Sequence, residues 1–131
     1  MQRTAVNPWN WSLGIGFDQA ELIEGGRRQL ICSGQTSVDA DGRPQHPGDM
    51  RVQVGLAMDN VEAVLAGADM TLGDVVRLNV YTTDVDAVLG CFDVIAQRFG
   101  AAGVRPASTL LGVTRLAIPE LMVELEATAV A

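Results

Sequence analysis

The chain has 131 residues, of which 48% are hydrophobic and 19% are charged, so we expect one domain spanning residues 1–131 around one core. Its formal net charge of −7 disfavours nucleic acids and anionic membranes as partners, because both would be repelled. A chain this short and this apolar is expected to bury part of its surface against a partner, which predicts a homo-oligomer.

The cysteines and the hydropathy pattern indicate a cytoplasmic protein. Cys32 and Cys91 are the two cysteines, and their number and separation predict free thiols rather than a disulfide framework. We find neither a signal-like segment at the start of the chain nor an apolar run of membrane length. We therefore expect no membrane association.

The first elements in the chain are predicted to be strands. Residues 20–37 predict two strands around a turn at Glu24–Arg27, and the second strand ends near the pair Ser33 and Gly34. A polar loop rich in glycine and proline follows over Asp39–Asp49.

Two helices and the strand between them are predicted from periodicity. Apolar residues at three-and-four spacing predict a helix over Met50–Leu65, with Asp49 as its N-cap and Gly67 at its end. Val75–Thr82 alternates as a half-buried strand does. A second helix is predicted over Val85–Phe99, starting from a capping-box-like Thr83.

Two final strands, Ala107–Thr114 and Glu120–Val130, complete an α+β order of β-β-β-α-β-α-β-β. Right-handed crossovers would place both helices on one face of a mixed sheet. The opposite face then needs cover, and packing against sister subunits would provide it.

Few side chains suggest chemistry by type and spacing alone. One histidine and two distant cysteines argue against a zinc site. Glu124 and Glu126 lie two apart on a strand and share a face, so one carboxyl could acquire a raised pKa and shuttle protons. Solvated carboxylates, or carboxylates paired with arginines at a subunit edge, are the alternative that spacing favours. Ser108 and Thr109 offer hydroxyls, although polar residues commonly fill such strand positions.

Four segments in register resemble the Rid family, the reactive intermediate deaminases, also called the YjgF or L-PSP endoribonuclease family. They are "ICSGQTSVDADG", "MDNVEAVLAGADMTLGDVVRLNVYTTDVD", "RPASTLLGVTRLAIP" and "VELEATAV", within residues 16–130. The resemblance implies a chorismate-mutase-like fold and a homotrimer with a barrel-like core. It also implies ligand clefts between subunits, no metal and no cofactor.

Part of the family's site is present in this sequence. Ser33 and Gly34 match the family's Ser-Gly pair, and Glu124 matches the glutamate that positions the attacking water. The resemblance implies that these three residues keep their family roles, with Glu124 as the catalytic residue.

Other positions of the implied site are changed. Phe17 takes the place of a tyrosine, Leu110 that of a cysteine, and Phe92 falls near an asparagine. Ser108, beside Thr109, takes the place of the arginine that clamps the substrate carboxylate. Those five residues are predicted to bind the ligand, but the cleft would lack its usual cation.

Other arginines of the chain could replace the missing one. Arg105 and Arg115 lie at odd offsets from Ser108, which on a regular strand places their side chains on the opposite face. Arg77, on another strand, stays possible.

The resemblance implies hydrolysis of imines and enamines to 2-oxo acids and ammonia. Because Ser108 carries no charge, we expect weak or no action on carboxylate-bearing imines. The main hypothesis is hydrolysis or tautomerisation of a neutral or bulkier imine, enamine or related carbonyl compound. The alternative is a non-catalytic trimer that binds a small ligand. Ribonuclease action, suggested by the family's older name, conflicts with the acidic balance of the chain.

Overall fold

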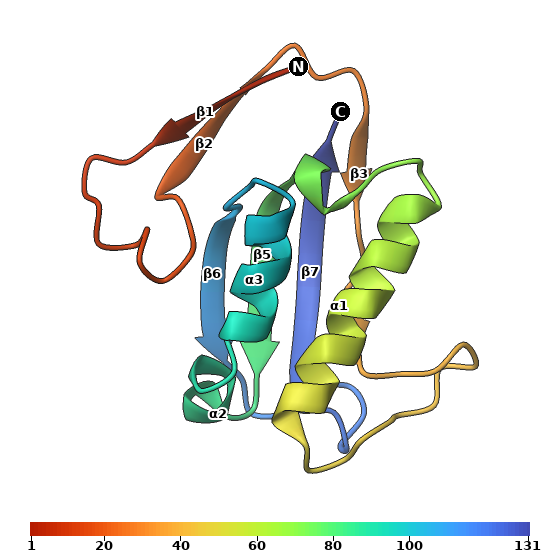
Figure 1. Cartoon of the computed structure of the whole chain (residues 1–131). Coiled ribbons are helices and arrows are strands. Elements are labelled where there is room, and N and C mark those ends of the chain that lie inside the picture. Colours follow the sequence, from red (N-terminus) through yellow and green to blue (C-terminus); the bar gives the residue numbers. More distant parts are fainter.

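The computed structural model describes residues 1–131 and contains a main sheet, a separate two-stranded sheet and a helical layer (Figure 1). The strands are β1 (Gln2–Val6), β2 (Ala20–Glu24), β3 (Gln29–Ile31), β4 (Gln35–Thr36), β5 (Val75–Thr82), β6 (Ala107–Gly112) and β7 (Val123–Val130). The helices are α1 (Met50–Ala66), the 3-10 turn η1 (Leu72–Asp74), α2 (Val85–Leu89) and α3 (Asp93–Ala101).

The main sheet is mixed, as predicted. Its strand order is β3-β7-β5-β6, and β4 also pairs with β7. β5 and β6 run parallel, whereas β7 is antiparallel to each of its partners. α1 and α3 lie side by side across one face of this sheet, which confirms the α+β arrangement with helices on one face (Figure 1).

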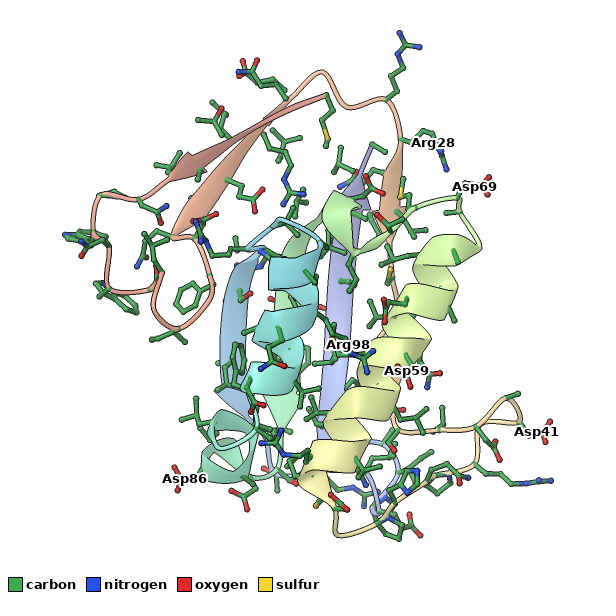
Figure 2. All side chains as sticks on the ribbon, in the orientation of Figure 1. Arg28, Asp41, Asp59, Asp69, Asp86 and Arg98 are labelled. Carbon is green, nitrogen blue, oxygen red and sulfur yellow. The ribbon has the colours of Figure 1, made fainter.

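The hydrophobic core lies between the helices and the sheet. Alternate residues of β7 are fully buried, and they pack with the buried stripe of α1 and with Ile95 and Phe99 of α3. Arg98 of α3 also links the two helices, because its guanidinium binds Asp59 at 2.6 Å and Glu62 at 2.8 Å on α1. Figure 2 shows Arg98 on α3 and Asp59 on α1 close to one another between the two helices.

The first predicted helix and the first predicted crossover strand are confirmed. Asp49 caps α1 by accepting a hydrogen bond from the Val52 amide at 3.2 Å, and Gly67 is its C-cap. The strand predicted over Val75–Thr82 is β5 with the same bounds.

The predicted hairpin around Glu24–Arg27 is wrong. β2 pairs with β1, and β3 pairs with β7 instead. The chain turns at Gly25, which has a φ of 74°, and the amides of Arg27 and Arg28 then donate to the Ala131 carbonyl at the end of β7. The following strand is therefore held by the sheet and not by its sequence neighbour.

The second predicted helix is divided in two, so the order β-β-β-α-β-α-β-β needs correction. α2 stops at Gly90, its C-cap, and α3 begins after Phe92. The N-cap of α2 is Asp84 rather than Thr83, and it accepts from the Ala87 amide at 3.1 Å. Four strands, not three, precede α1. The last two strands are shorter than predicted.

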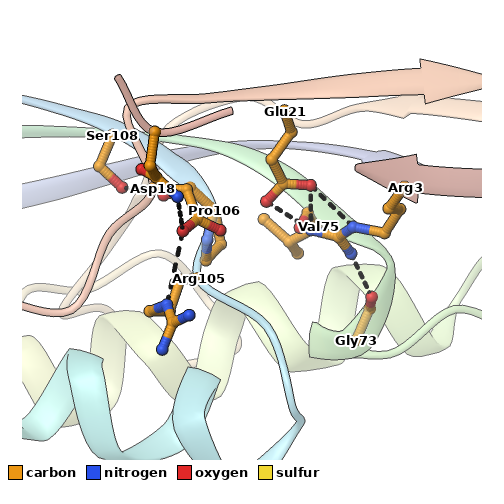
Figure 3. Close-up of polar contacts among 9 residues, drawn as sticks. Arg3, Asp18, Glu21, Gly73, Val75, Arg105, Pro106 and Ser108 are labelled. Carbon is orange, nitrogen blue, oxygen red and sulfur yellow. Dashed lines mark hydrogen bonds and ion pairs between the residues drawn. The ribbon is translucent and has the colours of Figure 1, made fainter. Parts of the chain in front are cut away.

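The two-stranded sheet is fastened to the main sheet by one arginine. The Arg3 guanidinium on β1 donates to both carboxylate oxygens of Glu21 on β2, each at 2.8 Å (Figure 3). It also donates to the carbonyl oxygens of Gly73 and Val75, at 2.5 and 2.7 Å. This arrangement fixes both ends of the loop 7–19 near the start of β5.

Both cysteines are buried and unpaired, which confirms the prediction of free thiols. Burial raises the pKa of each thiol, and at Cys91 the nearby Arg51 opposes part of that rise. In addition, the helices of the chain are all too short or too polar to cross a lipid bilayer.

Candidate functional site

Five of the eight predicted site residues meet around one pocket of about 190 Å³, which we call the apolar pocket. It lies where β6 meets α2, the start of α3 and the loop 7–19. Its lining is Ile15, Phe17, Val80, Leu89, Phe92, Ser108, Thr109 and Leu110. Six of these residues are hydrophobic and none is charged, so the pocket suits an uncharged apolar group.

The loop 7–19 supplies the outer wall of the apolar pocket. Gly16 has a φ of 110°, and a Cβ there would lie 3.1 Å from the Cβ of Ala96 on α3, so the loop packs closely on that helix. The Phe17 ring is held edge-on against Trp11, with ring centroids 5.8 Å apart. The local backbone therefore directs Phe17 into the lining of the apolar pocket.

Ser108 lies on the helix-facing side of β6. It pairs in register with the buried Leu78, and Leu110 pairs with the buried Val80. The Ser108 hydroxyl donates to the Pro106 carbonyl oxygen at 2.9 Å. A serine has one hydroxyl proton, so Ser108 has only lone pairs left for a ligand. In this state it can accept from an N–H group but cannot donate to a carboxylate.

Arg77 does not lie beside the Ser108 side chain. Its guanidinium donates to the Thr109 hydroxyl at 2.5 Å. Because Arg77 precedes Leu78 on β5, it projects from the sheet face opposite to Ser108.

The other two arginines also have partners elsewhere. Arg105 forms an ion pair with Asp18 at 3.5 Å. Arg115 donates to the carbonyl oxygens of Leu116 and Ala117.

The remaining three predicted residues, Ser33, Gly34 and Glu124, form a second group, the glutamate corner. A Cβ on Gly34 would lie 1.8 Å from Glu124 Oε1, so the carboxylate occupies the space that a side chain would need. The absence of a side chain at Gly34 therefore allows Glu124 to take this position. Ser33 is exposed and Glu124 is half-buried.

Glu126 differs from Glu124 although both lie on the same face of β7. Glu126 Oε1 accepts from the Asn79 amide at 3.0 Å and from the Tyr81 hydroxyl at 3.1 Å. Desolvation of the Tyr81 phenol, followed by its hydrogen bond to Glu126, raises the pKa of Tyr81. Glu126 is therefore held by its neighbours, whereas the side chain of Glu124 has no such donor.

The two groups are separated within one chain. Ser108 is on β6 at one edge of the sheet, and Glu124 is on β7, two strands away across β5. Two strand spacings amount to about 10 Å. The side chains also project from opposite faces, because Glu124 pairs with Tyr81 and Ser108 pairs with Leu78. A small ligand in the apolar pocket cannot contact Glu124 of the same chain.

Comparisons with known proteins identify the relatives of this fold. The family model described as Endoribonuclease L-PSP, which is that of the Rid or YjgF family, matches residues 20–131. The chain belongs to the Rid family. YjgH of Escherichia coli, described as a RutC family protein, is 34% identical over 118 residues, covering 89% of this chain and 88% of YjgH. A RutC family protein of Pyrococcus horikoshii is 30% identical over 100 residues, which are 76% and 77% of the two chains.

Solved Rid structures agree with the architecture. The conserved Rid protein YyfB of Yersinia pestis, described as having unknown function, superposes with a TM-score of 0.86 at 34% identity, and the whole of both chains is covered. Escherichia coli TdcF, crystallised with bound serine, gives a TM-score of 0.71 at 26% identity over 97% of this chain and 91% of TdcF. TdcF carries the name of a candidate reactive intermediate deaminase.

Three residues of the apolar pocket were not predicted from the sequence. Val80 is on the buried face of the alternating strand, so its pattern indicates only core packing, and Ile15 lies in a loop without periodicity. Leu89 follows the apolar spacing of the second predicted helix, which would bury it, but it is 53% exposed and lines the pocket. It is the last residue of α2, which ends at the C-cap Gly90.

Proposed function

We propose that this Rid family chain hydrolyses or tautomerises a small neutral imine, enamine or related carbonyl compound, without a cofactor. Its cleft would combine the apolar pocket of one chain with the glutamate corner of a neighbour in a homotrimer. Membership of a family that contains TdcF supports the reaction class. The separation of the two groups in one chain is the observation that carries the proposal, because each is incomplete by itself.

The open face of the main sheet supports association between copies. Ile31 and Leu111 project from this face and are 74% and 50% exposed. A neighbouring copy would remove these apolar side chains from water. It would also bring a second sheet close to β6, the edge strand that supplies Ser108, Thr109 and Leu110 to the apolar pocket.

The proposed reaction assigns chemical roles to Glu124 and Ser108. Glu124 would accept a proton from water as the water oxygen bonds to the carbon of the C=N group, and it would pass that proton to the nitrogen. In the resulting carbinolamine, Glu124 would move the proton of the new hydroxyl to the nitrogen, so that the C–N bond breaks, ammonia leaves and a carbonyl product remains. In a tautomerisation, Glu124 would instead move a proton between carbon and nitrogen. Ser108 would accept a hydrogen bond from the substrate N–H.

The preference for a neutral substrate follows from the lining of the apolar pocket. Each hydrogen bond to a charged group contributes about 1.5–3 kcal/mol, so one lost from the transition state lowers the rate about tenfold to a hundredfold. A carboxylate in the apolar pocket would find no charged partner among the lining residues. A carboxamide of the same shape would avoid that penalty.

A matched pair of imines tests this preference. One carries a carboxylate and the other the corresponding carboxamide, and ammonia release is measured with each. We expect faster hydrolysis of the carboxamide by the natural chain, and Ser108→Arg should reverse the preference. Equal or faster hydrolysis of the carboxylate by the natural chain would contradict the proposed specificity.

Mixed trimers test the shared cleft. Glu124→Gln damages the glutamate corner, and Leu110→Trp fills the apolar pocket. If each cleft combines two chains, randomly mixed trimers of the two inactive variants should regain on the order of a quarter of the natural activity. Mixtures as inactive as their components would rule out the shared cleft.

The non-catalytic alternative is favoured by one observation, since the only hydroxyl proton of Ser108 is already engaged. Thermal shift with a metabolite collection, followed by turnover assays of the ligands found, separates a binder from an enzyme.

The cytoplasm is the proposed compartment, and fractionation of cells tests it. Ribonuclease action is disfavoured by the net charge of −7. RNA cleavage that is lost in Glu124→Gln would revive it.

A further inference from the structure

A second pocket, of about 400 Å³, lies between the two-stranded sheet and the end of α3, and we call it the hairpin pocket. It shares no lining residue with the apolar pocket. Its lining is Arg3, Ala5, Asp18, Glu21, Gly100, Gly103, Val104 and Arg105. Four of these residues are charged, so its chemistry is opposite to that of the apolar pocket.

The first of its two ion pairs is closed to ligands. Both carboxylate oxygens of Glu21 are bound by Arg3, and Arg3 also binds two backbone carbonyl oxygens. The Glu21 side chain is only 5% exposed. This pair therefore holds the pocket wall in place.

The second ion pair is open. Arg105 approaches Asp18 Oδ1 only through Nε, at 3.5 Å, and its two terminal nitrogens have no protein acceptor. The Asp18 side chain is 8% exposed. Its Oδ1 accepts from the Asn7 amide at 2.9 Å, while Oδ2 receives no hydrogen bond from the protein. Figure 3 shows the Arg105 guanidinium extending from Pro106 toward the helical layer, clear of the Arg3–Glu21 pair.

We propose that the hairpin pocket binds a small zwitterion with one ammonium and one carboxylate group, that is, a free amino acid. The carboxylate would bind the terminal nitrogens of Arg105 in a bidentate pair. The ammonium would bind Asp18 Oδ2, which receives no hydrogen bond from the protein and belongs to a side chain that is only 8% exposed. An anion alone would face Asp18, and a cation alone would face Arg105, so neither satisfies both groups.

The end of α3 complements this ligand. Its C-terminal carbonyl groups carry partial negative charge and favour a nearby ammonium. Gly100 and Gly103 line the pocket without side chains, and a Cβ at either position would meet nothing within 4 Å. Val104 offers an apolar surface to a short aliphatic side chain.

L-Alanine is the probe, and ethylamine and propionate are its matched controls, since each lacks one of the two charged groups. Titrations are followed by the amide signals of Gly100 and Gly103 in two-dimensional NMR spectra. We expect alanine to shift these signals and to bind at least about tenfold more tightly than either control. The absence of such shifts, or equal binding of a control, would overturn the proposal.

Variants connect the binding to the named groups. Arg105→Gln and Asp18→Asn should each weaken alanine binding at least about tenfold. Gly100→Leu should abolish it by filling the pocket, and this variant keeps the test valid if Asp18→Asn does not fold. Arg43→Gln is the control, because Arg43 is an exposed arginine with a single ion pair at 3.6 Å. Binding that survives Arg105→Gln and Gly100→Leu unchanged would also overturn the proposal.

Discussion

The two faces of β7 serve different purposes although they share one backbone. Toward the helices, Val123, Leu125, Ala127 and Ala129 are no more than 1% exposed and belong to the core. Toward the open side, the glutamates at 124 and 126 are half-buried and face Gly34, Asn79 and Tyr81. The alternation of side chains along a strand therefore separates residues that stabilise the fold from residues available for chemistry.

Leu125→Ala is expected to have the largest effect on stability. Leu125 is fully buried, so truncation should lower the free energy of unfolding by about 2–5 kcal/mol. The matched variant Glu124→Ala, one residue away on the open face, should change it by less than about 1 kcal/mol. Urea denaturation at one fixed protein concentration measures both, and similar losses in the two variants would contradict the division of roles.

Gly34→Ala should lower turnover on the identified substrate about tenfold to a hundredfold while leaving the fold intact. The new Cβ would meet Oε1 of Glu124 at 1.8 Å and its Cγ at 2.8 Å, so the whole carboxylate side chain must move. Gly14→Ala is the control, because a Cβ there meets nothing within 4 Å. Full activity in Gly34→Ala would show that the position of Glu124 is unimportant.

Titration of Tyr81 reports on the open face of the main sheet and on no other region, because Tyr81 is the only tyrosine of the chain. Its pKa is raised above the ordinary value of 10.0 by desolvation and by the carboxylate of Glu126. A phenol with a raised pKa in the folded state loses its stabilising contribution as the pH climbs through the alkaline range. Tyrosinate absorbance should therefore develop above pH 10, and Glu126→Gln should move the transition down. A transition that does not move in this variant would contradict the role of Glu126.

The smallest expected effect is on the reactivity of Cys32 and Cys91, the two thiols of the core. Burial raises the pKa of Cys32 and Cys91, so little reactive thiolate exists at pH 8. A disulfide reagent that releases a coloured thiolate should react slowly with the folded chain and rapidly after denaturation. Fast reaction without denaturant would show that the helix-covered face of the main sheet, where both thiols are buried, opens more easily than their burial indicates.

The sequence predicted those parts of the fold that depend on local patterns. α1 and β5 follow from their periodicity and from the cap at Asp49. The pairing of β2 could not be predicted, because its partner β1 lies across the loop 7–19 and the turn at Gly25 resembles that of a hairpin. The break at Gly90 was missed since the apolar spacing continues across it.

The sequence selected candidate site residues but did not predict their arrangement. Family resemblance selected Phe17 and Ser108, and the structure brings them to one pocket. It also selected Glu124, whose position two strands away depends on the strand order of the sheet. The charged hairpin pocket gave no sequence signal, because Asp18 and Arg105 are far apart in the chain and meet only after folding.

The fastening of the loop 7–19 by Arg3 has a consequence for how substrate range could change. Ile15 and Phe17 lie before residue 20, where the match to the family model begins, whereas the rest of the apolar pocket lies within it. The residues of the segment 7–19 do not belong to the hydrophobic core, so replacing this segment would change the pocket lining and leave the core residues in place. Grafting this segment from other Rid proteins offers a route to engineered selectivity.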